Sequence, residues 1–125
     1  MTSLNNESLK VCSTSPTTGY YRDGYCRNYP DDTGTHVVCA ELTNDFLQYT
    51  KKRGNNLITP RNGFPGLHSG QRWCLCAARW EEARKAGKAP PIILESSHKS
   101  ALKFNKLKTY KKHALKRQKT NKSRK

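Results

Sequence analysis

The chain has 125 residues, 34% of them apolar, and a formal net charge of +15. This length is typical of one domain with extensions, and no run approaches the roughly eighteen apolar residues that a membrane-spanning helix needs. Residues 1–95 carry twelve basic and nine acidic residues, whereas residues 96–125 carry twelve basic residues and no acidic ones. The composition therefore excludes a membrane span and sets the last quarter of the chain apart as a cationic segment.

The amino-terminal region reads as a polar end followed by an aromatic loop. Residues 1–10 contain neither a secretory signal nor a transit peptide, so we expect a flexible terminus and a cytoplasmic protein, with a nuclear or organelle-encoded protein as the alternative. Residues 11–30 mix proline and glycine with four tyrosines, which predicts an ordered loop packed by aromatic rings. A β-branched run then predicts a strand over residues 35–40.

A helix is predicted over residues 44–53. Thr43 is its expected N-cap, and Leu42 and Leu47 have the spacing of a hydrophobic staple. Residues 55–71 follow as a long connection rich in glycine and proline, which we expect to be ordered and anchored by Phe64 and Leu67. His68 near its tip is expected to be solvated, with a catalytic role as the less favoured alternative.

A second principal helix is predicted over residues 72–86, because Trp73, Cys76, Ala77, Trp80 and Ala83 recur at steps of three and four. Gly87 would end it. On a helix, Cys74 and Cys76 would point to opposite sides, so they would neither pair nor bind one metal ion. Cys76 is then interpreted as a small core residue and Cys74 as a separate thiol.

The carboxyl-terminal part begins with an extended Pro-Pro entry into a short strand at residues 92–94. A helix capped by Ser96 or Ser97 is predicted through Phe104. Beyond it, helical spacing continues among lysines, and this segment is expected to order on a partner.

Several motifs in order resemble an uncharacterised bacterial family, domain of unknown function 2237. They are Cys12, Thr18-Gly19-Tyr20-Tyr21-Arg22-Asp23-Gly24, Gly34-Thr35-His36-Val37-Val38-Cys39-Ala40, Phe46-Leu47, Arg53-Gly54-Asn55, Thr59-Pro60-Arg61, residues 63–87, Ala89-Pro90-Pro91 and Leu94-Glu95. The chain departs from the family where Tyr25 replaces a cysteine and where Asn56 and Gln71 replace aspartates. The resemblance implies a family-like domain over residues 11–107, leaves 108–125 as a basic extension, and implies no reaction.

The five cysteines are interpreted as buried free thiols, because an odd count without a secretory signal argues against a disulfide framework. Cys74-Leu75-Cys76 is one residue short of a zinc-binding pair. A structural metal held by some of Cys12, Cys26, Cys39, His36 and His68 stays open. A Cys–His nucleophile is the less favoured interpretation, since no nucleophile-elbow motif accompanies any cysteine.

The sequence thus predicts a small α+β domain with short strands, two principal helices and long ordered loops. We expect a non-catalytic RNA-binding protein, ribosome-associated and without a cofactor, whose cations contact phosphate beside neighbouring proteins of the particle. The expected RNA-binding residues are Lys103, Lys106, Lys108, Lys111, Lys112, Lys116, Arg117, Lys119, Lys122, Arg124 and Lys125. The alternative is a small enzyme or a thiol- or metal-binding domain, which a pocket uniting His36, Asp23 and a cysteine would support.

Overall fold

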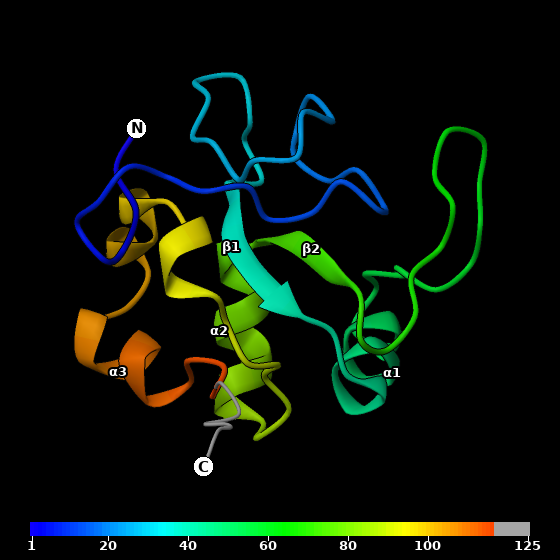
Figure 1. The fold of residues 1–125 in the computed structure, drawn as a ribbon. Coiled ribbons are helices and arrows are strands. Elements are labelled where there is room, and N and C mark those ends of the chain that lie inside the picture. Colours follow the sequence, from blue (N-terminus) through cyan, green and yellow to red (C-terminus); the bar gives the residue numbers. More distant parts are fainter. Residues whose placement is uncertain (117–125) are drawn as a thin grey trace, which may run out of the picture.

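The computed structural model describes residues 1–116 and confirms an α+β domain (Figure 1). The expected RNA-binding residues from Arg117 to Lys125 lie outside the described part. The elements in chain order are β1 (His36–Glu41), α1 (Asn44–Lys52), β2 (Arg72–Cys76), α2 (Ala77–Lys85), the 3₁₀ turns η1 (Leu94–Ser96) and η2 (Lys99–Lys103), and α3 (Leu107–Lys112). Within residues 1–116, none of the helices is long and apolar enough to cross a membrane.

The sheet consists of β1 and β2, paired antiparallel. Cys39 lies opposite Cys74, and His36 lies opposite Cys76 beyond an irregularity in the pairing. Residues 37–40 of β1 are all buried, because α2 packs against this strand and η1 and η2 also contact it. The strand predicted at 35–40 is therefore present, one residue later, at the centre of the domain.

Helix α1 forms as the capping signals predict. The hydroxyl of Thr43 accepts the backbone N–H of Phe46 at 3.1 Å. Leu42 and Leu47 are both buried. Gly54 follows the helix with φ of +95°, a left-handed conformation that glycine adopts without steric cost.

The helix predicted over residues 72–86 is wrong in its first third. Residues 72–76 form β2, and α2 begins only at Ala77. Trp73, Cys74 and Leu75 are buried in succession, as expected for a strand covered on both faces, and their pairing with β1 replaces the helical hydrogen bonds. The later part of the prediction holds, since Trp80 and Ala83 are buried on α2.

The strand predicted at residues 92–94 is also wrong, whereas the helix predicted after it is present only as the 3₁₀ turn η2 (Lys99–Lys103), for which His98 rather than Ser96 or Ser97 is the N-cap. Ile92 donates its N–H to the carbonyl of His113, whereas Ile93 donates to Cys39, so successive residues bond to different neighbours and no ladder forms. The chain then turns through η1 and η2. Tertiary hydrogen bonds decide both outcomes, and local pattern does not reveal them.

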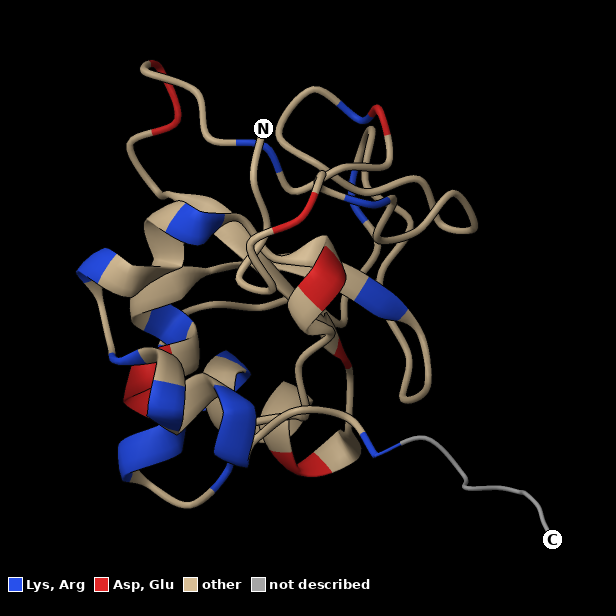
Figure 2. Cartoon of the chain, turned by 60° about the vertical axis from the view of Figure 1, so that its left-hand side comes forward, with Lys and Arg blue, Asp and Glu red and all other residues tan. Residues whose placement is uncertain are grey.

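The carboxyl-terminal segment orders on the domain itself as far as residue 116. Tyr110 of α3 is fully buried, its ring centroid lies 5.2 Å from that of Trp80, and its hydroxyl donates to the carbonyl of Ala101 at 2.7 Å. Leu115 donates its N–H to Ile92 at 2.7 Å. The lysines of this segment remain on the outside, and Figure 2 shows many basic positions on the helices at the lower left, with others on the upper and right-hand parts of the molecule.

The amino-terminal residues, for which composition predicts a flexible end, make specific contacts. Leu4 is buried and donates its N–H to Ser97 at 2.9 Å. Ser3 forms a β-bridge with His98. The amino-terminal residues are thus joined to the segment between η1 and η2.

Candidate functional site

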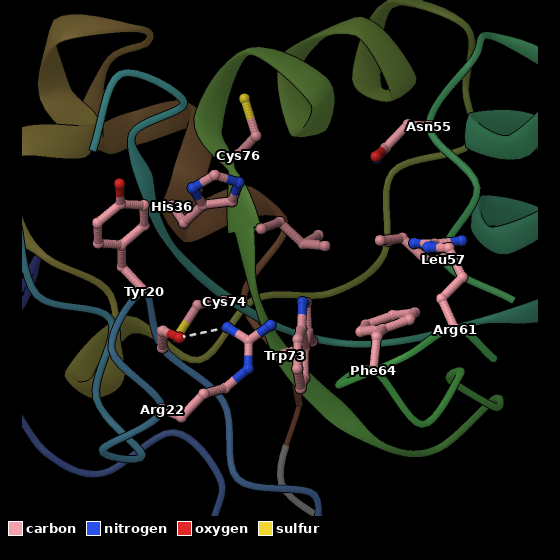
Figure 3. Close-up of a pocket in the computed structure, with 12 residues that line it drawn as sticks. Tyr20, Arg22, His36, Asn55, Leu57, Arg61, Phe64, Trp73, Cys74 and Cys76 are labelled. Carbon is pink, nitrogen blue, oxygen red and sulfur yellow. Dashed lines mark hydrogen bonds between the residues drawn. The ribbon is translucent and has the colours of Figure 1, made fainter. Parts of the chain in front are cut away.

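A pocket of about 390 Å³ opens beside β2, between the loop around residues 19–22 and the long connection after α1 (Figure 3). The residues that line it are Gly19, Tyr20, Arg22, His36, Asn55, Leu57, Arg61, Phe64, Trp73, Cys74, Leu75 and Cys76. Among these described residues are two arginines and a histidine, and no aspartate or glutamate. The pocket is therefore cationic, with an apolar floor.

Aromatic rings hold both arginines in place. The guanidinium of Arg22 lies 5.1 Å from the centroid of the Trp73 ring, and that of Arg61 lies 4.8 Å from the Phe64 ring. Trp73 and Phe64 meet edge to face with centroids 5.7 Å apart. Such cation–π contacts orient a guanidinium while leaving its N–H groups free for a planar anion. Arg22 is fixed further by a 2.7 Å hydrogen bond from Nη1 to the carbonyl of Gly19, the dashed line in Figure 3.

A second part of the pocket joins His36 to a buried carboxylate. Nδ1 of His36 lies 2.7 Å from Oδ1 of Asp32, whose side chain is fully buried. The other carboxylate oxygen of Asp32 accepts the backbone N–H of His36 at 2.8 Å. With Asp32 ionised and the imidazole neutral, this contact places the proton on Nδ1 and leaves Nε2 as a proton acceptor.

Cys76 completes this end of the pocket. It is the free cysteine, half-buried, and its Cα is paired with that of His36 across the sheet. Figure 3 shows both residues at the same end of the pocket, with the sulfur of Cys76 directed away from the imidazole. Cys76 is also the N-cap residue of α2. The strand-to-helix junction therefore presents a thiol beside an imidazole whose orientation a buried carboxylate fixes.

Left-handed backbone conformations occur at two residues of this site. Arg22 has φ of +56°, and Thr35, which precedes His36, has φ of +51°. Residues other than glycine rarely adopt such φ values, and β-branched residues adopt them least often. Each such conformation costs about 1–3 kcal/mol. The Thr35 carbonyl accepts the N–H groups of both Val37 and Ala77, which ties this strained residue to the start of α2.

The other four cysteines form two disulfides, so the interpretation as free thiols is wrong for them. Cys12 is bonded to Cys39, and Cys26 to Cys74. The sheet explains the pairing, since it sets Cys39 opposite Cys74 and each meets a cysteine from the amino-terminal loop. The odd number of cysteines does not exclude disulfides, because four cysteines pair and the fifth, Cys76, remains a free thiol at the pocket.

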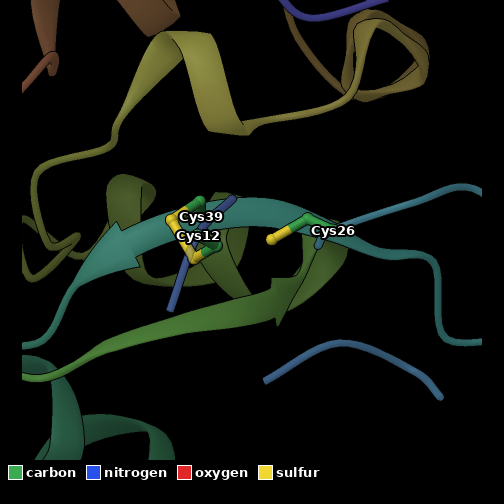
Figure 4. A group of neighbouring side chains, drawn as sticks. All are labelled: Cys12, Cys26 and Cys39. Carbon is green, nitrogen blue, oxygen red and sulfur yellow. A yellow bond between two sulfur atoms is a disulfide. The ribbon is translucent and has the colours of Figure 1, made fainter. Parts of the chain in front are cut away.

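The metal site kept open in the sequence is only partly assembled. The sulfur atoms of Cys12, Cys26 and Cys39 lie within 4.8 Å of one another (Figure 4), but all three are in disulfides, which leaves them no thiolate for a metal. His36 is bonded to Asp32 instead, and His68 is exposed in its loop. The histidines therefore do not join the cysteine cluster.

The pocket unites His36 with a cysteine, as the alternative interpretation required, but with a different carboxylate. Asp23 forms an ion pair with Arg27 at 2.9 Å, and Asp32 takes its place beside His36. Sequence pattern alone does not single out Arg22 and Arg61 as site residues, although both lie in motifs that carry the family resemblance. An aspartate four residues before a histidine was the available signal for the pair.

The expected RNA-binding lysines that the structure describes are not in the pocket. All six are exposed along the segment from η2 to the end of the described chain, namely Lys103, Lys106, Lys108, Lys111, Lys112 and Lys116. They form a surface separate from the pocket, which we call the lysine surface.

None of the curated proteins matches this chain. The model of a family described as an uncharacterized protein conserved in bacteria matches residues 2–114, further in both directions than the motifs alone imply. The match covers the pocket, both disulfides and α3. The chain therefore belongs to the family called domain of unknown function 2237.

Proposed function

We propose that the pocket binds a small anionic molecule with a planar, apolar body. The observation that carries this proposal is the pair of guanidinium groups, Arg22 and Arg61, each held on an aromatic face at a pocket lined by no carboxylate side chain. Guanidinium groups bind carboxylate or phosphate oxygens in bidentate geometry. The volume of about 390 Å³ is at the lower end of the range for small-molecule sites.

The apolar floor gives the second half of the recognition. Trp73 is 6% exposed and Leu75 is 2% exposed, so only a small part of each side chain reaches the pocket. A flat ring packed against Trp73 and Phe64 would continue their edge-to-face arrangement. The ligand class is therefore an aromatic or short apolar acid.

Binding can be followed through Trp73, since the chain has two tryptophans and the other, Trp80, is fully buried on α2. The probe is benzoate, with neutral benzamide as its isostere. We expect a saturable change in tryptophan fluorescence with benzoate and none with benzamide. Phenyl phosphate in place of benzoate tells a preference for carboxylate from one for phosphate.

Arginine variants make this test specific. Arg22→Gln and Arg61→Gln should each weaken benzoate binding about tenfold or more, because each removes a charge-assisted hydrogen-bond donor. Arg53→Gln is the matched control, since Arg53 pairs with Glu82 at 3.2 Å outside the pocket. Equal affinity of benzoate and benzamide, or equal losses in all three variants, would overturn the proposal.

A second candidate function is RNA binding, and the observation that favours it is the lysine surface. Its six exposed lysines continue a segment that carries no acidic residue from Ser96 to the chain end. Lysines spaced in this way suit phosphate contacts that are indifferent to base sequence. We propose a ribosomal particle in the cytoplasm as the partner, with its neighbouring proteins as further contacts.

The salt dependence of RNA association tests this second candidate. Because each neutralised phosphate releases a counterion, log K should fall with log salt by about 0.7–0.9 per contact. Replacing Lys108, Lys111 and Lys112 with glutamine should lower that slope, whereas the same change at Lys51 and Lys52 of α1 should not. An unchanged slope in the first variant would refute a role for the lysine surface.

A further inference from the structure

We infer that Cys76 is the nucleophile of an acyl-transfer reaction on a carboxylate-bearing acyl donor, with His36 as the proton acceptor and Asp32 as a positioning residue. This inference rests on the proposed anion-binding pocket and adds its chemistry. The favoured interpretation of the sequence treats every cysteine as inert, and the family description names no reaction.

The placement of the Cys76 thiol supports its role as the nucleophile. Cys76 and His36 are opposite one another at the end of the sheet, and both line the pocket. Directly opposed residues of antiparallel strands have Cβ atoms about 4.5–5.5 Å apart. The pairing is irregular next to His36, and rotation about the single side-chain torsion of Cys76 would turn its sulfur, which points away in Figure 3, towards the imidazole.

The hydrogen bonding of the His36 imidazole suits it to act as the base. Asp32 holds Nδ1 at 2.7 Å and is itself fixed by the backbone N–H of His36, so the ring and its tautomer are set from the protein side. The His36 side chain is 39% exposed, and its remaining nitrogen, Nε2, is the proton acceptor. A nucleophile, a base and a group that orients the base are the three parts of thiol-dependent acyl transfer.

The part of the pocket that contains the arginines can hold the rest of the substrate. Arg22 and Arg61 line the same pocket as Cys76 and lie apart from it in Figure 3. Trp73 and Leu75, alternate residues of β2, line one wall of the pocket. An acyl donor whose carboxylate is held by the arginines would lay its body on this wall and extend its carbonyl towards the thiol. The substrate class is therefore an ester or thioester of an acid that carries a second, free carboxylate.

The reaction balances with water as the final acceptor. The thiol proton passes to Nε2 of His36 as sulfur attacks the carbonyl carbon; the new C–S bond forms, and the bond from carbon to the alcohol or thiol leaving group breaks. That leaving group takes the proton from the imidazolium. Water then attacks the thioester with His36 as base, the C–S bond breaks, and the returned proton restores the Cys76 thiol. The N–H of Ala77 is bonded to the Thr35 carbonyl, but those of Ala78 and Arg79 in the first turn of α2 have no acceptor inside the helix and can donate to the oxyanion.

The test uses the full chain and two chromogenic esters. The mono-4-nitrophenyl ester of terephthalic acid carries the free carboxylate, and 4-nitrophenyl benzoate lacks it. We expect release of 4-nitrophenolate and a carboxybenzoyl adduct on the Cys76 peptide in mass spectrometry, formed at least tenfold faster than the benzoyl adduct of the neutral ester.

Variants assign the roles. Cys76→Ser should give no adduct at residue 76, and His36→Gln should slow acylation about 100-fold, with His68→Gln as the matched control. Asp32→Asn should lower the limiting acylation rate and leave the half-saturating ester concentration unchanged, whereas Asp31→Asn should change neither. Circular dichroism confirms that each variant is folded; should His36→Gln unfold, Asp32→Asn still tests the base.

The outcomes separate the two proposals. Unchanged nitrophenolate release in Cys76→Ser overturns the nucleophile, even when benzoate binding stands. A Cys76 adduct that forms equally fast from both esters supports the nucleophile and overturns the carboxylate-bearing substrate, and with it the anion pocket. Adducts confined to lysines overturn the inference.

Discussion

The imidazole of His36 lies close to Gly34, with its Cε1 atom nearest. A Cβ atom on Gly34 would be 2.4 Å from Cε1 of His36 and 3.1 Å from both ring nitrogens. The ring can occupy this position because Gly34 has no side chain, and its hydrogen bond to Asp32 holds it there. This contact makes Gly34 a test of how much the histidine orientation matters.

Gly34→Ala is expected to push the ring off its position and away from Asp32. Acylation of Cys76 should then fall at least tenfold, while the melting temperature changes by a few degrees at most, because the ring is partly exposed and can move outwards. Thr33→Ala, a neighbouring exposed position, is the control. Normal acylation by a folded Gly34→Ala protein would show that the ring orientation is not needed.

The buried face of α2 predicts a large difference between two neighbouring substitutions. Trp80 is fully buried and donates its indole N–H to the Pro90 carbonyl at 3.0 Å, so Trp80→Ala should cost about 3–5 kcal/mol of unfolding free energy. Glu82 forms only partly exposed ion pairs, so Glu82→Ala should cost about 1 kcal/mol or less. Urea unfolding measures both. Similar losses would contradict the observed packing.

The disulfides should contribute strongly to stability. They close loops with sequence separations of 27 and 48 residues, which correspond to about 3.5 and 4 kcal/mol in the chain-entropy account. Replacing Cys12 and Cys39, or Cys26 and Cys74, with serine pairs should therefore lower the melting temperature by more than ten degrees. Cys76→Ser should not, because Cys76 is free. Equal melting temperatures would mean that the disulfides stay reduced in solution.

How far the sequence predicts this molecule depends on where the deciding contact lies. Thr43 and Gly54 act through bonds within a few residues, and α1 is predicted almost to the residue. The stretch from Trp73 to Cys76 fits a helical face equally well, and only its pairing with β1 makes it a strand. That pairing is contact between residues more than thirty positions apart, to which local pattern is blind.

The candidate site shows the same limit. The sequence suggests His36 together with a cysteine, but the sheet register and the left-handed conformation of Thr35 decide which cysteine and which carboxylate lie beside it. Once residue 76 is taken out of a helix, its pairing with His36 follows. The incorrect helix prediction for residues 72–76 therefore concealed which cysteine lies opposite His36.

The free energy of unfolding should depend on pH through Glu81 of α2. Hydrogen bonds from Arg84, at 2.8 and 2.7 Å, lower the pKa of Glu81 below its ordinary 4.5 against the opposing effect of burial, and Asn105 adds a further bond. A lowered folded-state pKa gives stability that is present above the unfolded-state pKa and is lost as pH falls through the folded-state value. Glu81→Gln should therefore be less stable than the native chain near neutral pH and equally stable in strong acid. Glu7→Gln is the control, and a difference that persists in strong acid would contradict the ionic origin.

Two truncations separate the folded domain from the cationic end of the chain. A chain ending at Tyr110 loses the bonds that join His113 and Leu115 to Ile92, so its unfolding free energy should fall by about 2–4 kcal/mol. A chain ending at Lys116 keeps these bonds and should melt like the full protein. Only this longer chain tests RNA binding cleanly, because it retains the lysine surface and lacks the five cations from Arg117 to Lys125. If those cations contact phosphate, the salt slope of RNA association should drop by about one for each lost contact. An unchanged slope would place any RNA affinity on the lysine surface of the domain.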